Sequence, residues 1–360
     1  MSGGCQNALM RTAGMLAGTG KDSKAYAAAV QAVLTPMLGL DVCVVSSVDP
    51  ASGLLTSCEV FGSPRDDDRE LRIFELEWFS DDPLRYDELA NAESRAGSLR
   101  QAVDPTRVRR YREIIEPNGG YDEIRLSCVV DGSWWATVTG YRSVGAPAFT
   151  TEEVTKAAGI SEIVARGFRS SFLYTAVDQP GDLDRPPGAF SIDKRGDLVT
   201  TTTTAETWLD TLPSDRVSTL TKALAVHVDG NGQTTMTASG SAGPLSFHAA
   251  PLKGSDQHIS VIVEYPRPIH LTSLITEAYG LTPRERDVTG LVLLGLVTKQ
   301  IARRLAISEY TVQDHLKSVF VKTDTVTRGA LCAALYTRFY MKPQREGTDP
   351  SPYGYFIPPA

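Results

Sequence analysis

The chain has 360 residues, of which 42% are hydrophobic and 22% are charged, and its formal net charge is −7. This length allows two or three domains that each bury a core of their own. The acidic balance argues against a protein that coats nucleic acid. The sequence has neither a membrane-length apolar run nor a charged leader before an apolar core. We therefore expect a cytoplasmic protein that is neither inserted into a membrane nor exported.

Residues 1–20 are rich in Gly, Ala and Met, and we expect them to be flexible. We predict a first domain over residues 21–177. It starts with an amphipathic pattern that predicts a helix over residues 23–38. A short apolar run and a turn signal then predict a strand over residues 41–46, paired with a second strand over residues 54–61.

The remainder of this domain has an acidic stretch and a middle without clear periodicity, followed by a second hairpin and a long helix. Apolar runs predict strands over residues 123–130 and 134–142. Thr150 and Glu153 form a capping arrangement that opens a helix ending near Leu173. The order of helix, hairpin, variable middle, hairpin and helix predicts an α+β sensor domain.

Residues 121–173 resemble the closing half of a GAF domain. The resemblance implies a sheet with helices on one face and room for a small ligand on the other, but it carries over no ligand residue. The aromatic residues of interest for a ligand lie in the middle of the domain: Trp78, Phe79, Tyr86 and Tyr111. Trp134 and Trp135 could stack on a ligand, but adjacent residues of a strand point to opposite faces, so at most one of them can line a given pocket. We expect core packing instead.

A stretch rich in Pro, Gly and charge over residues 178–188 predicts a linker. The second domain is predicted over residues 186–268, with a hairpin, a helix through Trp208 and a three-strand finish. The predicted strands cover residues 188–193, 197–200, 233–239, 245–251 and 258–265. The threonine run at 200–204 is expected to end a strand or cap a helix. This order resembles a PAS-like fold.

A third domain is predicted over residues 270–340, entered by a connecting helix over residues 271–279, and residues 341–360 form a tail. Residues 281–340 hold nine Lys/Arg and five Asp/Glu, a net charge of +4, so the remainder carries −11. A basic module on an acidic body fits DNA binding by one part and sensing by another.

The sequence of the third domain contains clear signals for the start and end of its helices. Thr282 can cap a first helix, Pro283 occupies its first position, and Glu285 completes a capping box. Apolar residues recur at helical spacing until Gly295 ends the helix. A second, short helix follows Thr298, which can cap it.

Residues 306–308 leave room only for a tight turn, after which Ser308 can cap a third helix. One stripe of this helix is apolar and must face the first two: Val312, Leu316, Val319 and Phe320. A fourth helix begins near Thr327 and carries an apolar stripe of its own. This is the geometry of a helix-turn-helix.

The opposite side of the third helix is polar and would meet the major groove of DNA. Lys317 can bind a phosphate or a guanine edge, and Gln313 can pair with adenine. Asp314 can accept from a cytosine amino group, although phosphate repels it. The complete set of candidate DNA contacts is Lys299, Ser308, Tyr310, Thr311, Gln313, Asp314, Lys317, Ser318, Lys322 and Arg328.

These residues resemble the LuxR/FixJ/NarL-type helix-turn-helix of bacterial transcription regulators. The matching positions are Leu281-Thr282, Arg284-Glu285, Val288, Gly295, Ile301-Ala302, Leu305, Ile307-Ser308, Thr311-Val312, His315-Leu316, Phe320, Lys322 and Arg328. The resemblance implies that the third helix reads the major groove, that the fourth helix mediates dimer contacts, and that Lys299, Lys322 and Arg328 lie near the DNA backbone. It covers about a seventh of the chain. In actinobacterial regulators a GAF domain often precedes such a module.

Two departures from that family's pattern are visible. Thr323-Asp324-Thr325 stands where the family has an apolar residue, glycine and valine, and Val297 replaces a small polar residue. Both departures fall at turns of the motif.

The sequence contains no pattern that predicts a metal, redox, nucleotide-binding or catalytic site. The five cysteines are scattered and form no CxxC pair, which favours reduced thiols over a redox or metal site: Cys5, Cys43, Cys58, Cys128 and Cys332. The histidines lack metal-ligand spacing, and no nucleophile motif occurs. The glycines of residues 14–22 are spaced one residue too far apart for a phosphate loop. We expect no metal, no cofactor and no enzymatic activity.

The predicted fold class is therefore α+β, with GAF-like and PAS-like sensor domains followed by an all-α, four-helix LuxR-type helix-turn-helix. The predicted function is sequence-specific transcription regulation, controlled by a small molecule or another signal. The alternative is a ligand-binding signalling protein whose C-terminal module contacts a protein. The expected partners are double-stranded DNA and a second copy of the chain, with RNA polymerase and a small-molecule effector as further candidates.

Overall fold

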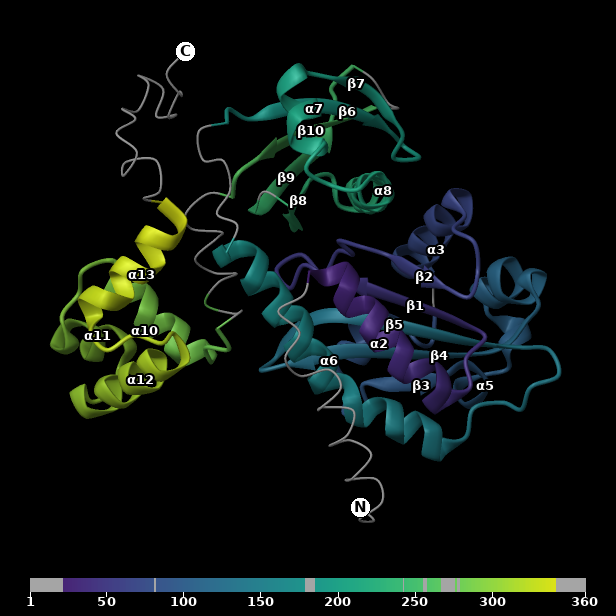
Figure 1. The fold of residues 1–360 in the computed structure, drawn as a ribbon, viewed down its shortest axis with the longest axis horizontal. Helices are drawn as coiled ribbons and strands as arrows, with labels where there is room; N and C mark the ends of the chain where they lie inside the picture. Colours follow the sequence, from purple (N-terminus) through teal and green to yellow (C-terminus); the bar gives the residue numbers. More distant parts are fainter. Residues whose placement is uncertain are drawn as a thin grey trace.

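The computed structural model describes residues 22–80, 82–178, 185–241, 243–254, 258–266, 276 and 279–340. In this part of the chain, two five-stranded antiparallel sheets precede a unit made only of helices (Figure 1). The predicted N-terminal flexible segment, the tail over 341–360, the glycines of 14–22, most of the linker and nearly all of the connecting helix over 271–279 lie outside the described residues.

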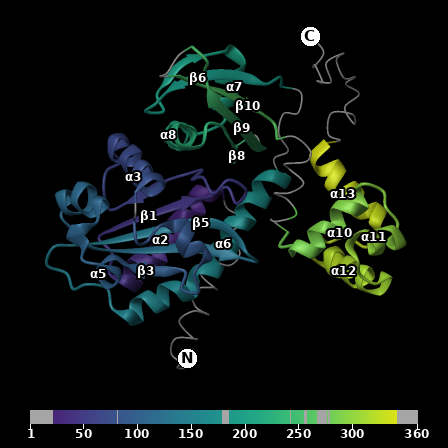
Figure 2. The same cartoon turned by 180° about the vertical axis from the view of Figure 1, so that it is seen from behind.

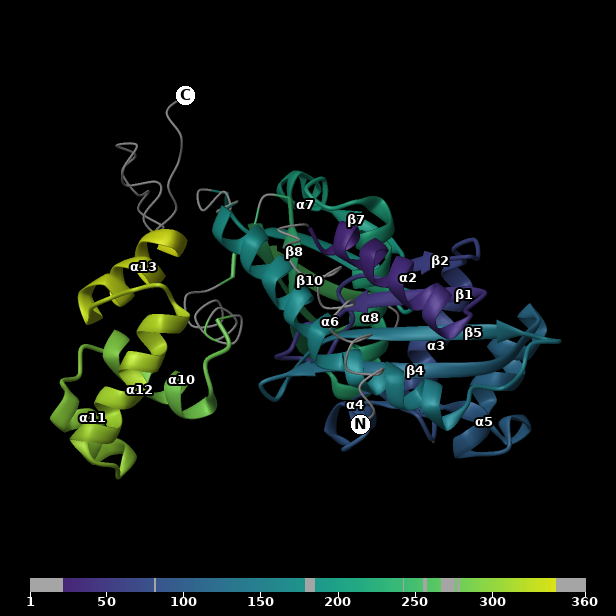
Figure 3. The same ribbon diagram turned by 60° about the horizontal axis from the view of Figure 1, so that its bottom comes forward.

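The first sheet has the strand order β2-β1-β5-β4-β3. Its strands are β1 (Val42–Ser47), β2 (Glu59–Phe61), β3 (Ala96–Ser98), β4 (Gly120–Val130) and β5 (Ser133–Ser143). Two helices, α2 (Ser23–Leu38) and α6 (Thr151–Asp178), pack on one face, as Figure 3 shows. The bounds of α2 are those predicted, because Tyr26, Val30 and Leu34 bury one stripe of it against the sheet.

Shorter elements cover the other face of this sheet. They are α3 (Asp67–Phe79), α4 (Tyr86–Asn91), α5 (Leu99–Ala102), η1 (Pro105–Arg107), η2 (Tyr111–Ile115) and η3 (Glu116–Asn118). This segment, whose sequence lacks clear periodicity, is a chain of short helices. Asp66 caps α3 by accepting a hydrogen bond from Arg69 N at 2.9 Å.

The partner strand predicted over residues 54–61 is wrong in its first half, since β2 begins only at Glu59. Side-chain hydroxyls interrupt the regular ladder there: Ser47 N donates to Ser57 Oγ at 3.1 Å, and Ser47 Oγ lies 2.8 Å from Thr56 Oγ1. Two backbone bonds also join these segments, from Thr56 N to Ser47 O at 2.8 Å and from Asp49 N to Leu54 O at 2.9 Å, and Leu55 forms an isolated bridge with Val48.

The second sheet repeats the order of the first, β7-β6-β10-β9-β8. Its strands are β6 (Gly188–Asp193), β7 (Leu198–Thr201), β8 (Thr234–Gly240), β9 (Gly243–Pro251) and β10 (His258–Glu264), and its helices are α7 (Thr203–Leu209) and α8 (Ser214–Asn231). The threonine run ends β7 and caps α7, because Thr202 Oγ1 accepts from Ala205 N.

Helix α8 was not located from the sequence. Its apolar residues face two directions, with Leu220 and Leu224 in the core of the second domain and Ala223 and Val226 against α3. A helix buried on two sides has no single apolar stripe, so its period is hard to read. Figure 2 shows α3 beside α8 where the two domains meet.

A residue of the first domain also completes the core of the second. Leu54, in the turn after β1, is fully buried among the core residues of the second sheet. Asp49 in the same turn accepts a hydrogen bond from Thr237 N of β8 at 3.3 Å. The two domains therefore share buried apolar and polar contacts.

The helical unit consists of α10 (Pro283–Leu293), α11 (Thr298–Leu305), α12 (Glu309–Lys322) and α13 (Arg328–Tyr340). One core joins all four helices, with Val288, Ile301, Val312, Val319 and Leu331 fully buried. Burial of each such side chain contributes roughly 1.5–3 kcal/mol. Among the described residues, no helix is long and apolar enough to cross a membrane.

Candidate functional site

The start of α10 has the predicted capping box. Thr282 Oγ1 accepts from Glu285 N at 3.3 Å, and Glu285 Oε2 accepts from Thr282 N at 2.7 Å. Two backbone donors that the helix itself cannot satisfy are thereby paired. Pro283 occupies the first helical position, as predicted.

The predicted cap of α11 is wrong. The N-cap residue is Val297, which has no side-chain acceptor, and Thr298 is already helical. Gln300 compensates, because its Oε1 accepts from Val297 N at 3.0 Å. The hydroxyl of Thr298 instead accepts from Arg328 Nη2 at 2.8 Å, which ties α11 to α13.

The turn before α12 is as short as predicted. Ala306 adopts a left-handed conformation with φ 53°, and Ser308 caps α12 by accepting from Thr311 N at 3.0 Å. Ser308 Oγ also lies 2.8 Å from Thr311 Oγ1. These two hydroxyls therefore fix the first turn of α12, next to the helix N-terminus that can attract phosphate.

The outer face of α12 is exposed and polar. Tyr310 is 71% exposed, and Gln313, Asp314 and Lys317 lie along the same open side. Lys317 Nζ lies 3.5 Å from Asp314 Oδ1 in a solvent-exposed pair. Lys299 is exposed on α11. Ser308 and Lys322 are exposed as well, so seven of the ten candidate DNA contacts reach solvent.

Three other candidates hold the motif together. Ser318 Oγ donates to Glu285 Oε1 at 2.5 Å, and Lys322 Nζ donates to Glu285 Oε2 at 2.7 Å. Lys322 also donates to Gly280 O at 2.9 Å. Arg328 Nη1 donates to Leu296 O at 3.1 Å in addition to its bond with Thr298. These bonds were not foreseen from the sequence.

The Glu285 carboxylate is almost fully buried at the centre of this network. Burial alone would raise the pKa of Glu285, but the hydrogen bonds from Lys322, Ser318 and Thr282 N outweigh that effect and hold the pKa below its usual range. The ionised carboxylate therefore joins α10 to α12.

The turn after α12 accommodates the departure at Asp324. Asp324 has φ 51°, a conformation that glycine adopts freely and that aspartate tolerates better than most residues. Thr325 N donates to Phe320 O at 2.9 Å, and the buried Thr323 donates to Val319 O at 2.8 Å. The turn thus closes without glycine.

A second feature is a cavity of about 140 Å³ in the first domain. Its floor is the sheet face that points away from α2 and α6, where Val44 of β1 lies opposite Thr139 of β5. Alternate strand residues reach it, because side chains along a strand alternate between faces. Its wall is α3, through Glu70, Ile73 and Phe74.

A group of buried charges borders the cavity at Arg125. Arg125 is 1% exposed and donates from Nη1 to Glu77 Oε2 at 2.6 Å and from Nε to Glu123 Oε1 at 3.2 Å. Its guanidinium lies 4.4 Å from the ring centre of Tyr86, whose hydroxyl is hydrogen-bonded to Thr139. The cation is thus neutralised by carboxylates and covered by an aromatic ring.

Of the four aromatic residues singled out, Tyr86 lines the cavity. Trp78 instead contacts His227 of the second domain edge to face, and Phe79 is exposed. Tyr111 is buried among apolar residues beside the cavity. Trp135 is buried in the core, as expected, whereas Trp134 is half-buried with its ring centre 6.4 Å from that of Tyr86. Within the described residues, no cluster of His, Cys, Asp or Glu suits a metal ion.

Comparison with known proteins identifies the C-terminal unit. Residues 280–331 match the family model of bacterial regulatory proteins, luxR family, and form a luxR-family helix-turn-helix domain. The chain is 47% identical over 51 residues to the monoamine regulon transcriptional regulator of Klebsiella aerogenes. It is 50% identical over 48 residues to the nitrate/nitrite response regulator protein NarL of Escherichia coli strain K12. The matches cover 14% and 13% of this chain and 22% of each relative.

The chain therefore spans about a fifth of the length of these relatives. Among solved structures, the VqsR LBD domain from Pseudomonas aeruginosa aligns with 48% of this chain and 99% of that chain, with 14% identity and a TM-score of 0.33.

Proposed function

We propose that the protein is a sequence-specific, DNA-binding transcriptional regulator. The observation that carries this proposal is the luxR-family helix-turn-helix with an open polar face on α12. Gln313 and Lys317 are placed to reach base edges, and Lys299 and Tyr310 to reach the backbone. Arg328 contributes positive charge beside that face, while Ser308, Thr311, Ser318 and Lys322, which is paired with Glu285, position the helix.

We propose that two copies of the chain bind DNA as a dimer. Each copy would insert α12 into the major groove of one half-site, and a twofold pair would require half-sites about 10 bp apart. We propose that the two copies contact each other through α13, as the resemblance to LuxR-type regulators implies. RNA polymerase is a further proposed partner, by the same resemblance.

The first two domains would supply the signal. Their strand order, the same in both sheets, supports the proposal of GAF-like and PAS-like sensors. The cavity beneath α3 would take a small-molecule effector. Its apolar wall and the hydroxyls of Ser46, Thr137 and Thr139 suit a partly apolar molecule that makes a few hydrogen bonds.

Selection of random duplexes by the full chain, followed by gel shifts, tests the proposal. We expect enrichment of a motif with two half-sites about one turn apart and binding that weakens steeply with salt. Lack of enrichment together with no mobility shift at low salt would contradict DNA binding. That result would favour the competing function, a ligand-binding signalling protein whose C-terminal module contacts another protein.

A further inference from the structure

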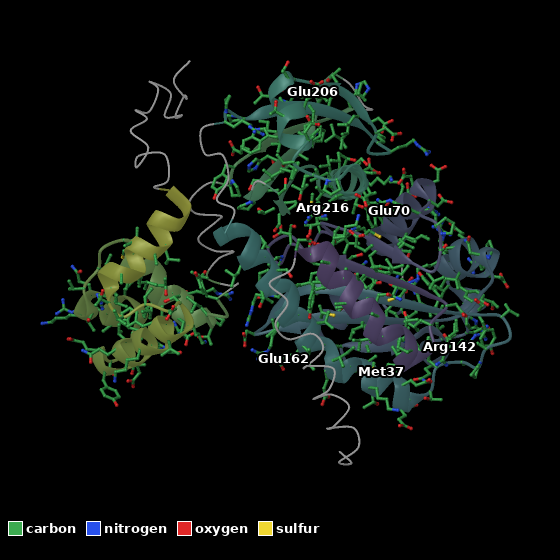
Figure 4. The ribbon with its side chains drawn as sticks, in the orientation of Figure 1. Met37, Glu70, Arg142, Glu162, Glu206 and Arg216 are labelled. Carbon is green, nitrogen blue, oxygen red and sulfur yellow. The ribbon has the colours of Figure 1, made fainter. Side chains whose placement is uncertain are left out.

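Helix α3 contacts both the cavity and the second domain. One face forms a wall of the cavity, through Glu70, Ile73 and Phe74 among others. The adjoining face packs against α8 of the second domain, where Leu71 and Phe74 meet Ala223 and Val226, so Phe74 takes part in both contacts. Figure 4 shows Glu70 on α3 near the boundary between the two domains. The helix is therefore a partition between the cavity and the second domain.

A buried polar network crosses this partition at Glu70. Glu70 Oε1 accepts from Thr219 Oγ1 of α8 at 2.7 Å, and Oε2 accepts from Arg65 Nη2 at 2.5 Å. Arg65 Nη2 also donates to Thr219 Oγ1 at 2.7 Å, and Lys222 Nζ of α8 lies 3.6 Å from Glu70 Oε2. Both Glu70 and Arg65 line the cavity as well.

This network depends strongly on the position of α3. Glu70 is 7% exposed and Thr219 is fully buried, so water cannot readily replace a lost hydrogen bond. Hydrogen bonds weaken steeply when the donor and acceptor separate or turn. A displacement of α3 would therefore leave a buried carboxylate poorly paired unless α8 moved with it.

We propose that α3 transmits occupancy of the cavity to the second domain, with Glu70 as the positioning residue that carries the change to Thr219 on α8. A molecule in the cavity contacts α3 because that helix is its wall. The change in α3 then reaches α8 through the Glu70–Thr219 hydrogen bond and the apolar contacts beside it. The inference rests on the proposed sensing role of the cavity and is independent of DNA binding.

The test fills the cavity with a side chain and measures amide hydrogen exchange in α8 of the full chain. Val44→Phe places a ring in the cavity from its floor. We expect the exchange rates of α8 amides to change at least threefold relative to the parent protein. In a Thr219→Val background, which keeps the shape of the side chain and removes its hydroxyl, the same filling should change them by less than half as much.

Thr221→Val is the matched control. Thr221 is also buried on α8, but its hydroxyl donates to Ser218 O within the same helix at 3.1 Å. The response to Val44→Phe should persist in that background. An equal response with and without the Thr219 hydroxyl would overturn the proposal, and so would the absence of any response in the parent background.

Val60→Phe, which fills the cavity from β2, serves if Val44→Phe does not fold. Because exchange is measured without DNA, failure of the coupling would leave the gel-shift result unaffected. Conversely, a protein that fails to bind DNA can still show the coupled response in α8.

Discussion

Lys322 Nζ donates to Glu285 Oε2 at 2.7 Å, so the last residue of α12 is bonded to the first turn of α10. The same carboxylate accepts hydrogen bonds from Ser318 Oγ and Thr282 N. The helix proposed to enter DNA is thus held at its far end by a charge inside the domain. Its exposed face and its buried attachment can be tested separately.

We expect Lys322→Met to destabilise the helix-turn-helix by about 1–2 kcal/mol at pH 7, a value reduced because the Lys322 side chain is 32% exposed. The pKa of Glu285 is lowered in the folded protein, so its contribution is present above the ordinary carboxyl value of 4.5. That contribution is lost as the pH falls through the folded pKa, and the variant should lose less stability on acidification.

Calorimetry of the parent and variant proteins between pH 3.5 and 7 measures this effect. Lys299→Met is the control, because Lys299 is exposed on α11. A variant whose unfolding keeps the parental dependence on pH would show that Glu285 does not need Lys322.

On DNA, Lys317→Ala should weaken binding to the selected site by about 1–3 kcal/mol and relax its sequence preference. Lys299→Ala should weaken binding to all duplexes alike, and it should reduce the slope of log affinity against log salt concentration by about one. Gel shifts on the selected site and on a scrambled duplex at several salt concentrations separate the two effects. Equal losses on both duplexes for Lys317→Ala would assign that residue to the backbone.

Asp314→Asn tests the acidic residue of the exposed face. Asp314 lies 3.5 Å from Lys317 in the free protein, so its charge reduces the local attraction for phosphate. We expect the variant to bind all duplexes about two- to fivefold more tightly at low salt, since an exposed charge of this kind is worth under about 1 kcal/mol. A loss of affinity confined to sites with a cytosine would instead show that Asp314 reads that base.

Leu54→Ala should destabilise the second domain, although the residue belongs to the first by sequence. Leu54 is fully buried among the second core, and such a truncation costs about 2–5 kcal/mol. Leu198→Ala on β7 is the control, since that side chain is 47% exposed. Exchange of amides in β9 and β10 reports the change, which should be near zero for the control.

Two thiols should resist alkylation until the protein unfolds. Burial raises the pKa of Cys43 and Cys58 to about 12, so at pH 8 roughly one molecule in 10,000 carries the reactive thiolate at either residue. Mass spectrometry after brief iodoacetamide treatment, with and without urea, measures this protection. Rapid labelling of Cys43 in the folded protein would contradict this protection, since Cys43 is 1% exposed, whereas Cys58 is half-buried beside the cavity.

The elements that were predicted well are determined by a few residues that are close together in the sequence. Thr282 and Glu285 fix the start of α10, and Ser308 fixes that of α12, through hydrogen bonds that span three residues. The hairpin of β4 and β5 is likewise local, with Asp131 and Gly132 at its turn. Sequence spacing alone is enough for such features.

The elements that were missed depend on partners far along the chain. Helix α8 is apolar on two sides because α3, some 150 residues earlier, covers one of them. Thr298 is not a cap because Arg328 engages its hydroxyl. The role of Ser318 and Lys322 around Glu285 likewise joins residues more than thirty positions apart. Periodicity within one helix cannot reveal such contacts.

The position of Leu54 bears on how the chain is made and how it could be rearranged. Leu54 is synthesised long before the strands of the second sheet. The core of that sheet can therefore form completely only when its own strands have been made and have packed against this earlier residue. A fragment cut at residues 178–188 would lack this side chain. Any exchange of the second domain between proteins would therefore have to carry the turn around Leu54 with it.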